Sequence, residues 1–331
     1  GSQDLLFPVD GSRVVVNEIL TNSEPPQEDF IEILNPASAP QDLSGWVLTD
    51  DPAVEKFVFP NGTTLQGKSL MALPESALGF GISSTGETVY LIRPEADMVV
   101  DSVRLDGATV NTAWGRFPNG SELWSWMNSL SPGELNTEPA TPALVINEIM
   151  YNPISGNDAD EFIEIHNPGS TELDISGWRF TDGVDWTFPA ESVMPPGAYW
   201  AISPDRERML SRYPDIDSDS VIGNYSGSLA NSRERLAISQ PVTDLDGNTG
   251  WALVDDVSYQ DGGRWGTWSN GDGSSLELID PHADNRLAAN WADSDDSNKS
   301  EWTTIEFTGR LDNGRNTPNE IHIMLMGAGE C

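Results

Sequence analysis

Carboxylate and amide side chains recur at two places in the chain and are the first candidates for chemistry. The recurring residues are Asn17, Glu18, Glu32 and Asn35 in one place, and Asn147, Glu148, Glu164 and Asn167 in the other. A hydrolase that works with two carboxyls needs them about 5–10 Å apart in a cleft, in contrasting environments.

A structural role explains these residues better. Val14, Val16 and Glu18 alternate along one segment, and Phe30 and Glu32 along another, so each acid should share an apolar face. A buried carboxylate must accept hydrogen bonds, most readily from loop N–H groups. Their occurrence in two copies also suits a requirement of the fold, so we expect these residues to support the structure rather than catalyse a reaction.

The histidines, the cysteine and the sequence motifs of the chain do not fit nucleophilic catalysis or zinc binding. The three histidines lack metal-ligand spacing, and the single cysteine, Cys331, stands at the last position. No serine-hydrolase, phosphate-loop or zinc-protease motif occurs in the sequence. We therefore predict that the chain is not an enzyme.

Calcium is the one candidate cofactor. Asp244, Asp246 and Asn248 place oxygen ligands at every second residue, as calcium loops do, but no glutamate follows at EF-hand spacing. Asp215, Asp217 and Asp219 have similar spacing, in the range 215–219. The alternative for each pattern is a solvated acidic loop, which is favoured over a bound ion.

Tryptophans offer a second kind of site. Trp46, Trp114 and Trp178 stand in repeated or motif-like segments and are expected in the cores. Other tryptophans lie in stretches rich in Gly, Ser and Asn, where an exposed ring could stack on a sugar or a protein partner. They are Trp124, Trp126, Trp265 and Trp268, and the alternative for each is to anchor its own loop.

The elements that carry these residues are themselves repeated. Blocks recur in the same order, which indicates a duplicated module. The pairs are Glu28–Pro36 with Asp160–Pro168, Leu43–Trp46 with Ile175–Trp178, Phe57–Pro60 with Trp186–Pro189, Gly86–Leu91 with Arg233–Ile238, and Val100–Val103 with Val254–Val257. The blocks are short, rich in Val, Ile, Phe and Trp, and bounded by Gly, Pro and Asn, so they predict strands of a β-sandwich or barrel. One helix is expected at Arg206–Tyr213, with Ser203 as its cap and Pro204 in its first turn.

The order of these motifs resembles the lamin tail domain family. The resemblance covers residues 12–137 and 143–291 and includes Trp114-Gly115-Arg116 and the closing segment Ser131–Asn136. It implies immunoglobulin-like β-sandwiches that serve as structural or interaction modules without known catalysis. In bacteria such modules are attached to large secreted or surface proteins. The second copy lacks the closing Pro-Gly-x-x-Asn motif.

The predicted fold is all-β, with two tandem immunoglobulin-like β-sandwiches and a short C-terminal β segment. The predicted layout is 1–11 a tag and lead-in, 12–137 the first module, 138–142 a linker, 143–300 the second module, and 301–331 the C-terminal segment or the start of a truncated jelly-roll domain.

Charge limits the partners. Fifty-three acidic residues face seventeen basic ones, a formal net charge of −36, which disfavours nucleic acid and anionic membranes. No apolar stretch approaches the length of a membrane span, so membrane insertion is not expected. We expect a bacterial protein, secreted or at the cell surface, whose chain spaces or anchors neighbouring domains. The alternative is a carbohydrate-binding module, and the expected partners are neighbouring domains, polysaccharide or a cell-surface protein.

Overall fold

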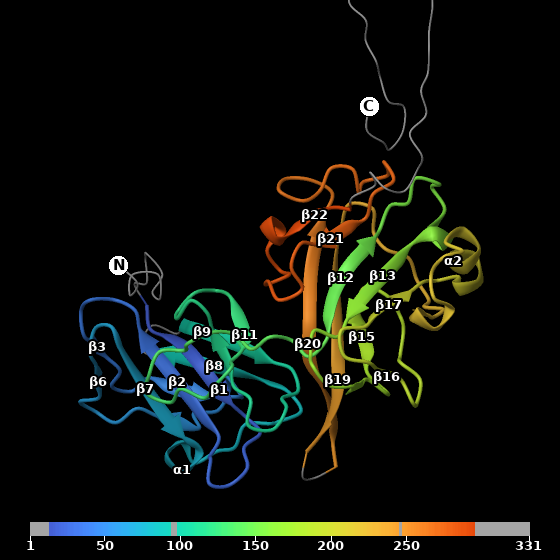
Figure 1. Cartoon of the computed structure of the whole chain (residues 1–331). Helices are drawn as coiled ribbons and strands as arrows, with labels where there is room; N and C mark the ends of the chain where they lie inside the picture. The colour runs from blue at the N-terminus through green and yellow to red at the C-terminus, as the bar shows by residue number, and fades with distance from the viewer. Residues whose placement is uncertain (1–12, 94–97, 245–246, 295–331) are drawn as a thin grey trace, which may run out of the picture. The chain divides into compact units, whose positions relative to one another are not determined.

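The computed structural model describes residues 13–93, 98–244 and 247–294, which form two compact β units (Figure 1). The first unit contains the chain up to Pro142 together with Ser239–Val254. The second contains Ala143–Ile238 and continues from Asp255. The predicted lead-in, the predicted C-terminal segment and Asp246 lie outside the described residues.

The first unit is built from antiparallel sheets, as its short segments bounded by glycine and proline predict. Its five-stranded sheet has the order β11 (Trp124–Trp126), β10 (Trp114–Arg116), β1 (Val15–Leu20), β2 (Phe30–Asn35), β7 (Ser69–Pro74). Its four-stranded sheet has the order β5 (Phe57–Val58), β4 (Val47–Thr49), β8 (Glu87–Arg93), β9 (Met98–Leu105). A short pair, β3 (Gln41–Asp42) with β6 (Thr64–Leu65), and one helical turn, α1 (Glu75–Leu78), complete it.

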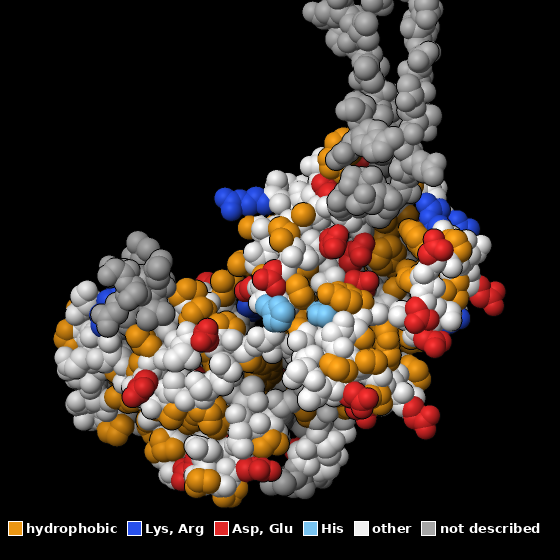
Figure 2. Space-filling model, in the orientation of Figure 1, with side chains coloured by type: hydrophobic (Ala, Val, Ile, Leu, Met, Phe, Trp, Pro, Cys, Tyr) orange, Lys and Arg blue, Asp and Glu red, His pale blue; other side chains and the backbone are white. Residues whose placement is uncertain are grey.

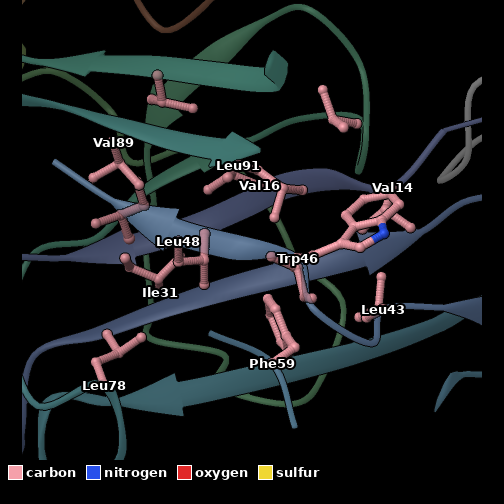
Figure 3. Packing of buried hydrophobic residues seen from close by; sticks show 14 of the residues in the cluster. Val14, Val16, Ile31, Leu43, Trp46, Leu48, Phe59, Leu78, Val89 and Leu91 are labelled. Carbon is pink, nitrogen blue, oxygen red and sulfur yellow. The ribbon is translucent and has the colours of Figure 1, made fainter. Parts of the chain in front are cut away.

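The core of the first unit lies between the two larger sheets. Val16 from β1, Ile31 from β2 and Leu91 from β8 are fully buried and belong to one hydrophobic cluster. Figure 3 shows the Trp46 indole in the same part of this core as Val14. Burying one such aliphatic side chain contributes roughly 1.5–3 kcal/mol, so this cluster is the main source of stability of the sandwich.

The second unit repeats the plan with additions. Its six-stranded sheet has the order β18 (Val221–Ile222), β17 (Tyr199–Ile202), β13 (Phe162–His166), β12 (Val145–Met150), β21 (Leu276–Leu278), β22 (Trp291–Asp293). A three-stranded sheet has the order β15 (Arg179–Asp182), β19 (Arg233–Thr243), β20 (Thr249–Gln260), and the parts of β19 and β20 within Ser239–Val254 belong to the first unit. The pair β14 (Leu173–Asp174) with β16 (Val193–Met194) forms a further short sheet. Three short 3-10 helices are η2 (Asp158–Asp160), η3 (Ser218–Ser220) and η4 (Ala288–Asn290). The prediction of an all-β fold is confirmed.

The predicted helix forms as α2 (Arg206–Arg212), but its cap differs from the prediction. Asp205 is the N-cap, and its side chain accepts a hydrogen bond from the Arg208 N–H. Pro204 therefore precedes the cap instead of occupying the first turn. Among the described residues, no helix has the length and apolar character needed to cross a membrane.

A β-bulge at the same place in both units decides where the repeated acids point. The register of β1 against β2 shifts between Val16 and Glu18, and that of β12 against β13 shifts between Ile146 and Glu148. An extra residue in a strand reverses the alternation of side chains beyond it. The expectation that Glu18 shares the face of Val14 and Val16 was therefore wrong.

Glu18 lies on the outer face of its sheet. It pairs directly with Glu32, which stands between the core residues Ile31 and Ile33 and so points away from the core. Paired residues on neighbouring strands share one face, so both glutamates point to the side of the sheet opposite the core.

Candidate functional site

The repeated acids of the first unit are held by the loop that follows β11. Ser131 donates from its N–H to Glu18 Oε1 (3.2 Å) and from its Oγ to Glu18 Oε2 (2.8 Å). The N–H of Gly133 donates to Glu32 Oε2 at 2.6 Å. Both glutamates are 0% exposed. These three hydrogen bonds from one loop to the two glutamates hold the loop over the outer face of the sheet.

Burial of this pair disfavours its charge. Desolvation raises the pKa of Glu32 to about 7, against the opposing effect of the Gly133 and Asn17 donors, and the neighbouring Glu18 raises it further. Burial also raises the pKa of Glu18, although the two donors of Ser131 oppose the shift. The pair therefore holds a proton at a pH where exposed glutamates are ionised.

Three buried asparagines complete the network. Asn17, the bulge residue, donates from Nδ2 to Glu32 Oε1 (3.2 Å) and to Asn119 Oδ1 (2.9 Å). Asn136 donates from Nδ2 to the carbonyls of Asn17 (3.2 Å) and Arg116 (2.9 Å). Each asparagine is at most 1% exposed. A buried network of this kind stabilises one loop conformation because every alternative leaves polar atoms without partners.

A second set of contacts satisfies the backbone of the bulge itself. Asp101 Oδ2 accepts from the Val16 N–H at 2.8 Å, and Arg116 Nε donates to the Val16 carbonyl at 2.7 Å. Arg116 also donates to both oxygens of Asp101, at 3.1 and 3.0 Å. The pairing of β1 with β10 covers Glu18 and Ile19 but not Val16, so on this side of β1 the ion pair satisfies the Val16 backbone groups in place of a strand.

In the second unit, Asp255 takes the place of Asp101, and the neutral Asn285 takes the place of Arg116. Asp255 Oδ2 accepts from the Ile146 N–H at 2.7 Å, as Asp101 does from Val16. Asn285 donates to Asp255 Oδ2 at 2.6 Å, where the first unit has the guanidinium of Arg116. Because burial dominates, the pKa of Asp255 rises to about 7.

The acid pair of the second unit is more open. Glu148 lies opposite Glu164 and accepts a hydrogen bond from the Ser275 hydroxyl. Asn147 donates to Glu164 Oε1 at 2.9 Å. Glu148 and Glu164 are half-buried rather than buried. Glu277 pairs with Glu148 at the position that Gly115 occupies in the first unit. Burial raises the pKa of Glu164 to about 7, and the charges of Glu148 and Glu277 add to the shift.

The repeated Asn-Pro asparagines tie a turn to its neighbour in both units. Asn35 Nδ2 lies 2.9–3.2 Å from the carbonyls of Ala39, Leu65 and Gln66. Asn167 Nδ2 lies 3.0–3.1 Å from those of Thr171, Met194 and Pro195. Their buried amides therefore satisfy loop carbonyls instead of facing a ligand.

Two of the predicted calcium residues, Asp244 and Asn248, lie between β19 and β20. Asp244 accepts from the Asn248 N–H and Nδ2, both at 2.8 Å. These two side chains thus bond to each other across the turn, and Asp246 lies outside the described residues. In the described part of the chain, no three His, Cys, Asp or Glu side chains come together as a metal site requires.

The four candidate stacking tryptophans have different environments. Trp124 is stacked on Trp114, with ring centroids 6.4 Å apart, and Arg116 lies 4.7 Å over its ring. Trp126 donates its indole N–H to the Leu253 carbonyl at 2.6 Å within the first unit. Trp265 is 9% exposed and packs against Trp291, whereas Trp268 is 52% exposed. Trp46 and Trp178 are each 7% exposed.

The sequence analysis did not identify Asp101, Asp255 and Asn285, whose side chains form the hydrogen bonds beside the two bulges. Asp101 and Asp255 occupy the same position in the repeated block Val100–Val103 and Val254–Val257, so an acid shared by both copies was the available signal. Asn285 has no such counterpart in the repeat, and no sequence pattern singles it out.

A buried acid of the second unit was also missed. Glu161, 1% exposed, accepts from the Tyr225 hydroxyl (3.1 Å) and from the Leu229 N–H (2.9 Å). Desolvation raises its pKa to about 7.

Comparison with known proteins agrees with the repeated architecture. The profile of the Lamin Tail Domain family matches residues 9–107 and 137–304. A crystal structure of a DUF4876 family protein from Bacteroides thetaiotaomicron aligns with 75% of this chain and 78% of its own, at 13% identity and a TM-score of 0.27, which is too low to support an argument. No curated protein sequence shows a significant match.

Proposed function

The chain belongs to the lamin tail domain family, and from this premise we propose that it is a non-catalytic extracellular module. In this proposal its two immunoglobulin-like sandwiches space or anchor neighbouring domains of a larger secreted or surface protein.

The observation that carries the proposal is the engagement of the repeated acids. Glu18 and Glu32, the best candidates for acid–base chemistry, are 0% exposed and bind donors of their own loop. A general acid or base must come within hydrogen-bond reach of a substrate. Carboxylates that hold a loop over a sheet stabilise a module instead, and a spacer depends on that stability.

The surface charge supports an extracellular setting. Figure 2 shows Asp and Glu side chains spread over the visible face of the molecule, with few Lys and Arg. The net charge of −36 keeps such a surface hydrated and repels polyanions. This supports a role in the medium or at a cell surface rather than at nucleic acid.

Force spectroscopy tests the spacer role. The chain is held between two handles and compared with a Gly/Ser linker of the same length, which behaves as a flexible coil. A spacer should show no extension at low force and then lengthen in discrete steps as folded units open. Continuous extension like that of the linker would contradict the proposal.

A second candidate function rests on one residue. Trp268 is 52% exposed on the second unit, which is unusual for so large an apolar side chain. We propose carbohydrate binding as the alternative function, and the geometry around this ring decides what it could bind.

A further inference from the structure

We propose that the turn Gly266–Asp272, with Trp268 as its stacking platform, binds a neutral polysaccharide. This inference rests on the second candidate function and is independent of the spacer role. It assigns the site to one of the four candidate tryptophans and names the class of ligand.

Hydrogen bonds to Asp293 and within the segment fix the conformation of the turn Gly266–Asp272. The two carboxylate oxygens of Asp293 accept from the N–H groups of Thr267 (2.9 Å) and Ser269 (2.8 Å), the residues on either side of Trp268. Ser269 Oγ donates to the Gly266 carbonyl at 3.2 Å, and the Asp272 N–H donates to the Trp268 carbonyl at 3.2 Å. A Cβ at Gly266 would collide with Asp293, so the turn requires glycine there.

Trp265 anchors the start of the turn while Trp268 stays outside. The Trp265 ring lies 6.0 Å from that of Trp291, which is 4% exposed. The chain thus buries one indole and leaves the other in solvent three residues later. An exposed ring on a backbone this well fixed is pre-organised for a ligand, because binding need not order the loop.

Polar side chains lie on the same turn as Trp268. Asn270 and Asp272 are exposed on the same turn, and Asn152 donates from Nδ2 to Asn270 Oδ1 at 2.7 Å. An aromatic face beside amide and carboxylate groups matches a hexopyranose ring, which presents C–H groups on one face and hydroxyls at its edge. The hydroxyls can both donate to and accept from such side chains.

Charge and the size of the exposed apolar surface limit the class of ligand that could bind at Trp268. Asp261 and Asp272 are exposed near Trp268 in sequence, in a chain of net charge −36, so an anionic polysaccharide would be repelled. A stable protein interface needs about 800 Å² per partner with several apolar anchors. One ring among polar side chains suits a sugar better.

The test is affinity electrophoresis of the full chain in native gels that contain mixed-linkage β-glucan, xylan or galactomannan, with polygalacturonate as the anionic control. At least one neutral polysaccharide should retard the wild type, and polygalacturonate should not. Trp268→Ala should weaken the retardation at least tenfold, Trp268→Phe should keep part of it, and Asn270→Ala should reduce it. Circular dichroism melts of the variants should match the wild type, because the Trp268 ring is exposed.

Ile279→Ala is the matched control, since Ile279 is 66% exposed elsewhere on the second unit. It should leave retardation unchanged. The proposal is overturned if no neutral polysaccharide retards the wild type, if Trp268→Ala is retarded as strongly, or if Ile279→Ala loses as much. Preferential retardation by polygalacturonate also overturns it. None of these results changes the force measurement, so failure of the sugar site and failure of the spacer role are distinguishable.

Discussion

Glu18 and Glu32 lie directly opposite each other on β1 and β2, and one loop donates hydrogen bonds to both. Two acids in this position repel each other when both are ionised, yet each accepts a backbone N–H of that loop, Glu18 from the buried Ser131 and Glu32 from Gly133. The pair thus joins the end of the first module to its first two strands, and it links the stability of the module to pH.

Removing one of these acids should destabilise its own unit. Glu18→Ala leaves the buried Ser131 N–H without its acceptor and leaves the Ser131 hydroxyl with only Asn136 Oδ1, so we expect a loss of roughly 1–3 kcal/mol in the free energy of unfolding. Glu18→Gln should cost less because its carbonyl oxygen still accepts. Glu148→Ala should cost less than Glu18→Ala, since Glu148 is half-buried. Urea unfolding of the four proteins measures this, and an unchanged midpoint for Glu18→Ala would contradict this role of Glu18.

Stability should fall as pH rises from about 4.5 to about 7. Glu32, Glu161, Glu164 and Asp255 have pKa values raised to about 7, so the folded chain binds more protons than the unfolded chain in this window. Their contribution is complete below the unfolded pKa and is lost as pH passes through the folded value. At about 1.4 kcal/mol per pKa unit, these shifts correspond to roughly 3–4 kcal/mol each as upper limits.

Thermal melts across this range measure the pH effect. We expect the highest melting temperature at the acidic end, and the variant Glu32→Gln should flatten the dependence for the first unit. A melting temperature that rises steadily from pH 5 to pH 8 would show that these acids ionise without cost.

Replacing Arg116 should lower the free energy of unfolding of the first unit by more than replacing Asn285 lowers that of the second. Arg116 and Asp101 form an ion pair whose side chains are 3% and 8% exposed. Arg116→Leu leaves Asp101 buried without its cation, which typically costs about 3–5 kcal/mol. Asn285→Leu removes a neutral donor from Asp255, for which roughly 1–3 kcal/mol is expected. Chemical unfolding of both variants checks the order, and equal losses would show that the cation has no special role.

Calcium at Asp244, Asp246 and Asn248 stays a prediction from the sequence. Binding would raise the melting temperature, with about 2.7 kcal/mol of stabilisation when free calcium is 100 times its dissociation constant. Magnesium should substitute poorly because it demands near-ideal octahedral geometry, whereas calcium accepts less regular sets of carboxylate and carbonyl oxygens. Melts in millimolar calcium and in chelator, on wild type and on Asp246→Ala, decide the matter. Equal melting temperatures for the wild type would reduce these residues to the turn seen between Asp244 and Asn248. A shift that survives Asp246→Ala would place the ion elsewhere, with 215–219 as the next candidate.

The sequence by itself determined the strands, the duplication and the family. Short Val-, Ile- and Trp-rich blocks with glycine and proline between them predict strands through local preferences, and their repetition needs no structure to be recognised. The same local signals located α2 but misplaced its cap by two residues. Ser203 and Asp205 are both good caps, and the difference depends on which of the two side chains accepts from the Arg208 N–H.

Only the tertiary structure decided where side chains point and what they contact. The bulge at Asn17 turns Glu18 to the outer face, and a bulge is defined by the pairing of two strands rather than by either one. Asp101 reaches Val16 across 85 residues of sequence, and Asp255 reaches Ile146 across 109. Trp265 and Trp268 stand three residues apart in one stretch rich in Gly, Ser and Asn, and they differ in exposure because the Trp265 ring packs against Trp291.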